Sequence, residues 1–282
     1  MELKPDCPAV NVSSLCRGVG MSTQNWYKGK TVRKRRQVNE ELVVTLVLEQ
    51  RRMHPRMGGK KLYFRLRGQL RREGVRIGRD RFFEVLRRHG LLVDPPPRSC
   101  RTTDSRHSLP MFPNLIRDME ITAPNQVWVS DITYVRTEDS FVYLALITDA
   151  YSRKIVGYHC GDSLEAIGCI RALDRALADL PEGACPIHHS DRGCQYCCHD
   201  YVNRLSNRGL GVSMTEIDHC AENALAERVN GILKQEYAIS ATFRSVEHAR
   251  AAVEQAIWLY NNGRPHLSLK MEVPEKVHRE AA

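Results

Sequence analysis

The second half of the chain alternates between short apolar runs and longer amphipathic segments. Apolar residues dominate the runs 126–135, 141–150 and 153–160, and short polar stretches separate them, which predicts an antiparallel meander of three strands. Helix and strand patterns then alternate, so the sequence predicts an α/β domain with a five-stranded sheet flanked by helices. The later predicted elements are helices at 163–180, 200–210, 222–237 and 245–262 and strands at 185–190 and 211–215.

Helical patterns fill the first half of the chain. Residues 13–28 predict a short helix, a turn around Gly20 and a second helix capped by Ser22. This spacing is typical of a helix-turn-helix, whose second helix exposes recognition residues; the alternative is a helical pair that only packs. The expected recognition residues are Thr23, Gln24 and Asn25.

Residues 39–93 predict a second all-α segment of three helices. The first helix ends before Pro55 and the second ends at Gly74. The third covers 78–93 and turns Phe82 toward the inner face, which leaves most of its arginines on the outer face. A basic final helix after two others is typical of a helix-turn-helix DNA-binding domain; the alternative is that some of these arginines only solvate the helix. The arginines expected to contact DNA are Arg79, Arg81, Arg87 and Arg88.

Charge separates the two halves. The formal net charge is +9, but residues 1–118 hold 26 Lys and Arg against 11 Asp and Glu, whereas residues 119–282 hold 16 against 22. A front half at +15 favours binding to a polyanion, with a merely solvated basic surface as the alternative. We therefore divide the chain into a short helix-turn-helix-like segment (1–35), a helical DNA-binding domain (36–93), a linker rich in proline and basic residues (94–118) and an α/β domain (119–282).

Composition excludes several classes of protein. No apolar run approaches the roughly 18 residues of a membrane span, and the N-terminus lacks a signal-peptide core, so a cytoplasmic protein is expected. Ten scattered cysteines are typical of reduced thiols. Cys194 and Cys197 form a C-x-x-C near His188, His189 and His199, which raises the alternative of a zinc site. No second pair at zinc-finger spacing follows them.

Three acidic residues carry the candidate chemistry. Asp131 lies in a predicted strand, Asp191 lies just past another, and Glu227 lies on a predicted helix. Three such carboxylates can hold two Mg²⁺ or Mn²⁺ ions about 3.5–4 Å apart, which suits in-line attack on a phosphodiester. Glu222 competes with Glu227, but five helical residues turn the two side chains about 140° apart, so only one of them can face the aspartates.

These residues lie in strings that resemble a known family. Together the strings resemble the orfB-type transposases of the insertion sequence three family, which have a retroviral-integrase-like DDE catalytic core of the RNase H-like fold. Each string alone is weak, but their order and spacing are specific as a set. The strings are VSDITYV (129–135), HSDRGCQY (189–196), AENALAERVNGILKQEY (221–237) and YNNGRPHLSL (260–269).

The resemblance implies roles for particular residues. In an RNase H-like sheet the first and fourth strands are neighbours, which would bring Asp131 and Asp191 together. The family spacing, with thirty-five residues between the last two acids, selects Glu227. Lys234, seven residues later, matches a basic residue that contacts the transposon-end DNA. Asn223 and Asn230 share roughly its helix face and are expected to orient that end.

The resemblance also implies an activity and partners. It implies a DNA transposase that carries out metal-dependent strand cleavage and strand transfer at insertion-sequence ends. The expected partners are double-stranded DNA, as terminal inverted repeats and target, further copies of this chain on that DNA, and an upstream orfA-type protein with a helix-turn-helix and leucine zipper. Two alternatives remain, a transposase-derived DNA-binding regulator with an inactive core and an RNase H-type nuclease that does not join strands.

Overall fold

The computed structural model describes residues 11–94, 109–216 and 222–281. Two compact units make up the chain. The first comprises Met1–Gln50 and Leu62–Leu92, and the second comprises Arg51–Lys61 and Val93–Ala282.

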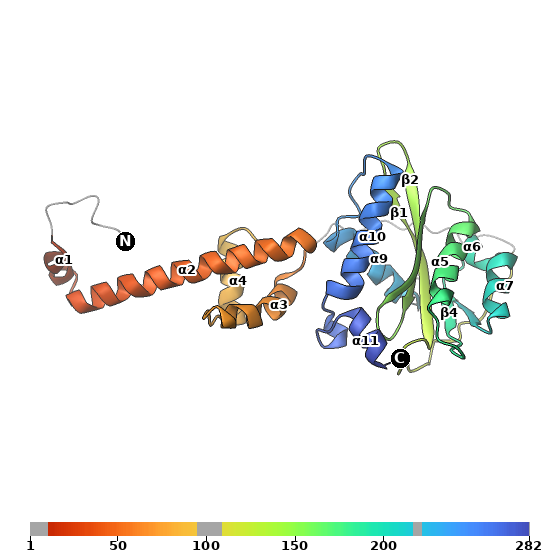
Figure 1. Cartoon of the computed structure of the whole chain (residues 1–282), viewed down its shortest axis with the longest axis horizontal. Coiled ribbons are helices and arrows are strands. Elements are labelled where there is room, and N and C mark those ends of the chain that lie inside the picture. Colours follow the sequence, from red (N-terminus) through yellow and green to blue (C-terminus); the bar gives the residue numbers. More distant parts are fainter. Residues whose placement is uncertain (1–10, 95–108, 217–221, 282) are drawn as a thin grey trace. The chain divides into compact units, whose positions relative to one another are not determined.

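The first unit is helical, as predicted (Figure 1). Its core forms because apolar residues recur at helical spacing, so that Leu66 and Leu70 of one helix and Phe82 and Leu86 of another are all buried. Gly74, with φ 76°, adopts the left-handed conformation that ends a helix at the predicted position. The helices that contribute to this unit are α1 (Val12–Gly18), α2 (Thr23–Met53), α3 (Gly59–Arg72) and α4 (Arg79–Arg88).

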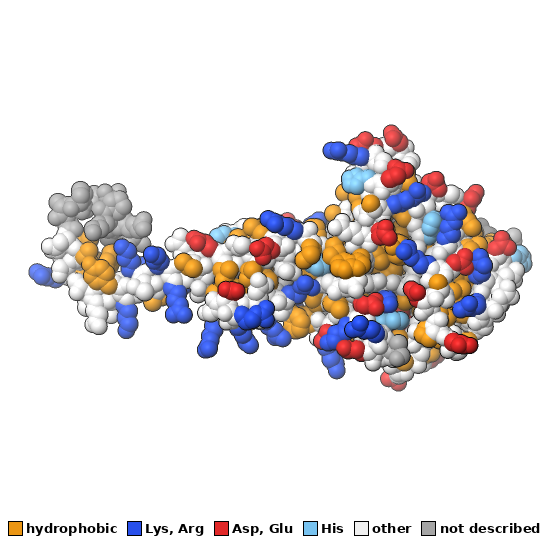
Figure 2. Space-filling view, viewed as in Figure 1, with side chains coloured by type: hydrophobic (Ala, Val, Ile, Leu, Met, Phe, Trp, Pro, Cys, Tyr) orange, Lys and Arg blue, Asp and Glu red, His pale blue; other side chains and the backbone are white. Residues whose placement is uncertain are grey.

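Helix α2 differs from the expectation. It runs without a break from Thr23 to Met53 and so crosses the predicted boundary between residues 35 and 36. The sequence between these ends contains no proline and only one glycine, Gly29, so nothing stops the helix. None of the side chains from Thr23 to Val38 is buried, and Figure 2 shows Lys and Arg side chains gathered along this part of the chain.

The second unit contains the predicted mixed five-stranded sheet, in the order β3-β2-β1-β4-β5. The first three strands are antiparallel, while β4 runs parallel to β1 and β5 runs parallel to β4. The first and fourth strands are therefore neighbours, as expected. The strands are β1 (Val127–Arg136), β2 (Phe141–Asp149), β3 (Ile155–Gly161), β4 (Ile187–Ser190) and β5 (Gly211–Met214).

Helices cover both faces of this sheet (Figure 1). Helices α5 (Ala166–Ala178), α6 (Cys194–Cys197) and α7 (His199–Asn207) pack on one face, and α9 (Ala224–Glu236) and α10 (Val246–Gly263) pack on the other. The short elements α6, η1 (Leu267–Leu269) and α11 (Pro274–Ala281) were not predicted.

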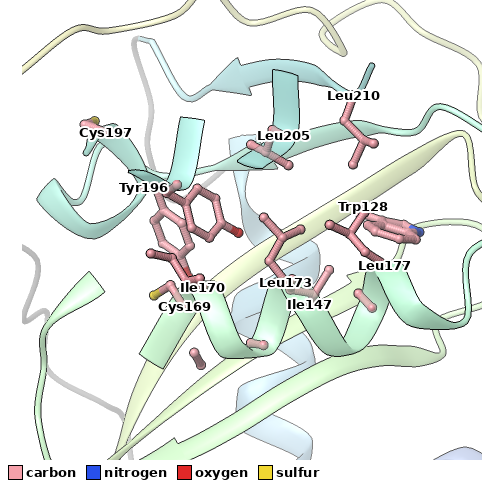
Figure 3. Packing of buried hydrophobic residues seen from close by; sticks show 14 of the residues in the cluster. Trp128, Ile147, Cys169, Ile170, Leu173, Leu177, Tyr196, Cys197, Leu205 and Leu210 are labelled. Atoms are coloured by element: carbon pink, nitrogen blue, oxygen red, sulfur yellow. The ribbon is translucent and has the colours of Figure 1, made fainter. Parts of the chain in front are cut away.

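Alternation along the strands supplies both cores. Ile147 packs with Trp128, Leu173 and Leu177 on the α5 face (Figure 3), whereas its neighbour Leu146 packs on the α9 face. Helix α5 lies close to β3, because a Cβ atom at Gly157 would lie 2.3 Å from the carbonyl oxygen of Ala172. None of the helices in the described residues is both long and apolar enough to cross a membrane.

Candidate active site

The site begins where β1 and β4 lie side by side. The parallel register pairs Val129 with His189, and two residues further along the chain are Asp131 and Asp191. The two carboxyl groups thus approach each other from neighbouring segments, as the strand order predicts. Burial and the negative charge of Asp191 raise the pKa of Asp131 to about 7.

Helix α9 lies over this pair of aspartates. Its Asn230 donates a hydrogen bond from Nδ2 to Asp131 Oδ2 at 2.8 Å, and Asn223 donates from Nδ2 to the carbonyl oxygen of Ser130 at 3.0 Å. Glu227 lies one helical turn before Asn230, on the exposed surface, and its charge raises the pKa of Asp131 further. The helix therefore adds a third carboxylate to the electrostatic surroundings of Asp131.

Neutral groups support the aspartates from beneath. His188 Nε2 lies 2.6 Å from the hydroxyl of Ser130 and 2.8 Å from the hydroxyl of Tyr201. Burial lowers the pKa of His188 to about 3, so this ring adds no charge below Asp131. Asp191 follows the end of β4, where its Oδ1 accepts a hydrogen bond from the Gly193 N–H at 3.0 Å.

The acidic residues fit a divalent metal of the Mg²⁺ type. Within the described ranges, no three His, Cys, Asp or Glu side chains are close enough together to enclose one ion. Mg²⁺ needs no such cage, because it binds one or two carboxylates together with water and substrate phosphates. Asp131 and Asp191 supply hard oxygen ligands. The buried Oδ1 atoms of Asn223 and Asn230 have no hydrogen-bond partner among the described residues, which leaves acceptors for metal-bound water.

Comparison with known proteins identifies the family. Two integrase core domain families match the chain, one over residues 121–220 and the other over residues 208–274. The chain is 34% identical to the insertion element IS600 uncharacterized 31 kDa protein of Shigella sonnei, over 95% of this chain and 100% of that protein. It is 30% identical to the transposase InsF for insertion sequence IS3A of Escherichia coli K12, over 91% and 90%.

The chain belongs to the insertion-sequence transposases with an integrase core. This confirms the resemblance drawn from the sequence strings. Such a core is a DDE polynucleotidyl transferase that acts on DNA and depends on a divalent metal. A solved HTLV-2 integrase catalytic core domain in complex with magnesium aligns with 55% of this chain and 97% of that chain, at 19% identity and a TM-score of 0.44.

Lys234 lies beside the acidic group of this transposase. It is half-buried, not fully solvated, because α9 packs closely on the sheet. Burial lowers the pKa of Lys234, and the negative charge of Asp131 opposes that shift. Lys234 therefore faces the same side as the acidic residues, as its spacing from Glu227 predicts. Glu222, the competitor of Glu227 in the sequence, instead forms an ion pair with Arg117, whose Nη2 donates to Glu222 Oε1 at 3.3 Å.

The burial of Asn223 and Asn230 does not match the expectation that they orient DNA. Their exposed fractions are only 3% and 6%, and both amides donate hydrogen bonds within the protein. Helical spacing correctly placed them near the face of Glu227. Helical spacing does not show which part of this helix face packs against the sheet. The sequence therefore predicted that Asn223 and Asn230 lie on the surface.

The arginines of α4 mostly have partners. Arg79 pairs with Asp80 at 2.9 Å, whereas Arg81 and Arg88 both pair with Glu40 of α2. Arg87 is exposed and makes no ion pair within the part of the chain that the structure describes.

The candidate recognition residues lie at the start of α2. Thr23, Gln24 and Asn25 are all exposed, and the Asn25 N–H donates to Ser22 Oγ at 3.2 Å, so the expected N-cap is present. A short helix, a turn and a longer helix are observed in this order, as the sequence predicts.

The Cys and His cluster does not form a metal site in the described residues. Cys197 Sγ contacts Met214 Sδ at 3.7 Å, and Cys198 Sγ donates to the Gln195 carbonyl oxygen at 3.2 Å. The cysteines of the described segments are free thiols, in agreement with the prediction of reduced cysteine.

The YNNGRPH string has a structural role that the sequence did not define. Asn261 accepts from the Ile155 N–H and donates to the Ile155 carbonyl oxygen, both at 2.9 Å, so it binds α10 to the edge strand β3. The Tyr260 hydroxyl donates to the Arg153 carbonyl oxygen at 3.0 Å. The string matched the family, but local periodicity did not predict that Asn261 and Tyr260 bond to the main chain of Ile155 and Arg153.

Proposed function

We propose that this transposase cleaves DNA at insertion-sequence ends and joins the freed 3′-hydroxyl to a second phosphodiester, with Asp131, Asp191 and Glu227 as its catalytic metal ligands. The observation that carries the proposal is the placement of Asp131. Its carboxyl group lies beside Asp191, under α9, where Glu227 adds a further negative charge. Three carboxylates that repel one another are stable together when cations neutralise them.

Each residue of the site has a defined task in this proposal. Asp131 and Asp191 would hold two Mg²⁺ or Mn²⁺ ions between them, and Glu227 would complete the second position. A divalent metal held by these residues would supply the Lewis acidity that lowers the pKa of the attacking hydroxyl and stabilises the leaving oxygen. Asn230 holds the Asp131 carboxylate in one orientation through its 2.8 Å hydrogen bond. Lys234 binds a phosphate of the end.

The finer partners are part of the same proposal. Terminal inverted repeats and target DNA would bind the basic first unit, with Arg87, Thr23, Gln24 and Asn25 as exposed contacts. Arg79, Arg81 and Arg88 would reach phosphates only by leaving or sharing their carboxylate partners. Further copies of the chain and an upstream orfA-type protein would complete the assembly on DNA.

A strand-transfer assay with matched DNA ends tests the proposal. Asp131→Asn, Asp191→Asn and Glu227→Gln should each lower cleavage and joining by roughly 10⁴-fold while DNA binding remains. Asp174→Asn is the matched control. The Asp174 carboxylate pairs with Arg204, and both side chains are about half exposed, outside the proposed site. A triad variant that joins strands at the wild-type rate would remove that residue from the site.

The same assay separates the two alternatives. A regulator with an inactive core would bind the ends and give no metal-dependent product. A nuclease would give the cleaved strand and no joined strand. The joined product, formed only with a divalent metal, is the outcome that we expect.

A further inference from the structure

The C-terminal end of α9 holds a carboxylate in an unusual place. Glu236 is the last residue of the helix, where the helix dipole disfavours negative charge. Its side chain is nevertheless only 17% exposed. Two cations surround it. Arg264 donates from Nε to Oε2 at 2.8 Å and from Nη2 to Oε1 at 2.7 Å, and Lys61 donates from Nζ to Oε1 at 2.7 Å.

These three residues form what we call the Glu236 clamp (Lys61, Glu236 and Arg264). The side chains of Lys61 and Arg264 are 13% and 3% exposed, so the clamp is largely shielded from water. Burial alone would raise the pKa of Glu236, but the hydrogen bonds and charges of Arg264 and Lys61 outweigh burial and lower that pKa. Glu236 is therefore ionised at neutral pH.

The third donor nitrogen of Arg264, Nη1, also has a hydrogen-bond partner. Its Nη1 donates to His266 Nε2 at 2.9 Å, and the His266 ring packs edge-on against Tyr260 with a centroid separation of 5.0 Å. Burial and the charge of Arg264 lower the pKa of His266 to about 2, which keeps the ring a neutral acceptor. The string that contains Arg264 and His266 is thus built around the end of α9.

One main-chain and one side-chain contact hold the same end. The Arg56 N–H donates to the Glu236 carbonyl oxygen at 3.2 Å, and His54 Nδ1 lies 3.1 Å from the Tyr237 hydroxyl. A Cβ atom at Gly263 would lie 2.8 Å from the His54 ring, so only glycine fits there without movement. Residues 51–61 and 263–266 therefore meet around one helix terminus.

The other contacts of α9 explain why this terminus matters. Asn223 and Asn230 attach the first half of the helix to β1 through directional hydrogen bonds. Beyond them, Ile232 and Leu233 pack in the apolar core, and such packing is less directional than a hydrogen bond, so the contacts of Glu236 add a second fixed point to the rotation that Asn223 and Asn230 begin to define. Glu227 and Lys234 lie on the side of α9 whose direction depends on that rotation.

We propose that the Glu236 clamp is a positioning device that fixes the rotation of α9, and with it the direction of Glu227 toward the aspartates and of Lys234 toward DNA. This inference rests on the proposed function, since it assumes that Glu227 is catalytic. Lys61, Glu236 and Arg264 are positioning residues that contact neither substrate nor metal. A shift of about 1 Å at a reacting group lowers a rate by roughly 100-fold, so a small rotation would be measurable.

Full-length variants test the clamp. Glu236→Gln and Arg264→Met should lower kcat for end cleavage roughly tenfold to 100-fold, with little change in the KM for end DNA. Arg264→Lys keeps a cation but loses the two-pronged geometry, and its kcat should lie between Arg264→Met and wild type. Mn²⁺ affinity, measured by calorimetry without DNA, should also fall in Glu236→Gln. Asp174→Asn should match wild type in every measurement.

Controls separate positioning from folding and from the proposed function. Urea unfolding measures the folded fraction of each variant, and a kcat that falls only in proportion to that fraction would overturn the inference. If Glu236→Gln does not fold, Lys61→Met, which leaves the paired Glu236 and Arg264 in place, decides; unchanged kcat and Mn²⁺ affinity in it would overturn the inference. Glu227→Gln is run alongside: if it remains active, the proposed function fails, whereas an inactive Glu227→Gln beside fully active clamp variants refutes the clamp alone.

Discussion

Two aspartates of the second unit, Asp149 and Asp131, have surroundings that shift their pKa values in opposite directions. Asp149 is fully buried at the end of β2 and accepts hydrogen bonds from Ser152 and from the Asn125 N–H. Burial alone would raise its pKa, but His278, whose Nδ1 lies 3.7 Å from Asp149 Oδ1, and the hydrogen bonds of Ser152 outweigh burial and lower that pKa. Asp131 instead has a pKa raised to about 7, by burial and by the charge of Asp191.

The difference separates structural charge from functional charge. Around Asp149, the fold supplies a donor for each carboxylate oxygen. Around Asp131, each carboxylate oxygen also has a donor, Oδ2 from Asn230 at 2.8 Å and Oδ1 from the Ile132 N–H at 2.9 Å, but two more acids lie nearby and raise its pKa. At Asp131 these donors do not offset burial and the two neighbouring acids, whereas a divalent cation bound there, as we propose, would.

The largest effect on stability is expected at Asp149. Replacing it with Asn should lower the free energy of unfolding by roughly 2–4 kcal/mol at pH 7, because buried donors lose a charged acceptor. The depressed pKa means that this stabilisation is present above the unfolded-state pKa of about 4 and is lost as pH falls through the folded-state pKa. Urea unfolding between pH 3 and pH 8 measures it. Equal stability of Asp149→Asn and wild type at pH 7 would contradict the stabilising role assigned to ionised Asp149.

Asp131→Asn should have the opposite sign. Below about pH 4 Asp131 is protonated in both folded and unfolded chains, so the variant and wild type should be equally stable. As pH rises toward 7 the unfolded chain loses its proton first, and wild type loses stability. Above pH 7, without metal, the variant should be more stable by roughly 1–2 kcal/mol, a value reduced for partial solvent screening. A variant less stable than wild type at pH 8 contradicts this expectation.

Lys234→Ala should affect the DNA end more than the fold. Loss of one charged hydrogen bond to a phosphate should weaken binding of the terminal base pairs and slow joining by roughly tenfold, or about 1.4 kcal/mol. Joining kinetics at limiting DNA measure this effect, with urea unfolding as the control. Unaltered kinetics would place Lys234 outside the DNA path.

The smallest expected effect compares two arginines of α4. Arg87 makes no ion pair within the described residues, whereas Arg88 is paired with Glu40 and Glu84. If Arg87 contacts a phosphate, Arg87→Ala should reduce the log–log salt dependence of DNA binding by about 0.9. Arg88→Ala should change it less. Equal slopes for both variants would show that the ion pairs do not decide which arginine contacts DNA.

The sequence predicted what local patterns and motif spacing determine. Alternation along β1 and the matching strings placed Asp131, Asp191 and Glu227 correctly on a strand, past a strand and on a helix. Helical spacing also put Lys234 on the correct face. The continuous α2 was missed because residues 13–28 and 39–93 were interpreted as separate helical segments, although no breaking residue lies between them.

Contacts between distant residues could not be predicted in the same way. Lys61 and Glu236 lie 175 positions apart in the chain, and no periodicity connects them. The inward direction of Asn230 depends on how closely α9 packs on β1, which is a property of the assembled core. Likewise, the partners of Arg264 became visible only when α10 and the end of α9 were placed together.

Metal-linked stability tests the central claim most directly. Wild-type protein at pH 8 should gain stability with added MgCl₂ beyond what NaCl of equal ionic strength gives, because a ligand that binds only the folded state stabilises it. Asp131→Asn and Asp191→Asn should lose that gain, while Asp174→Asn should keep it. If both aspartate variants retained the full Mg²⁺-specific gain, Asp131 and Asp191 would not be the metal site.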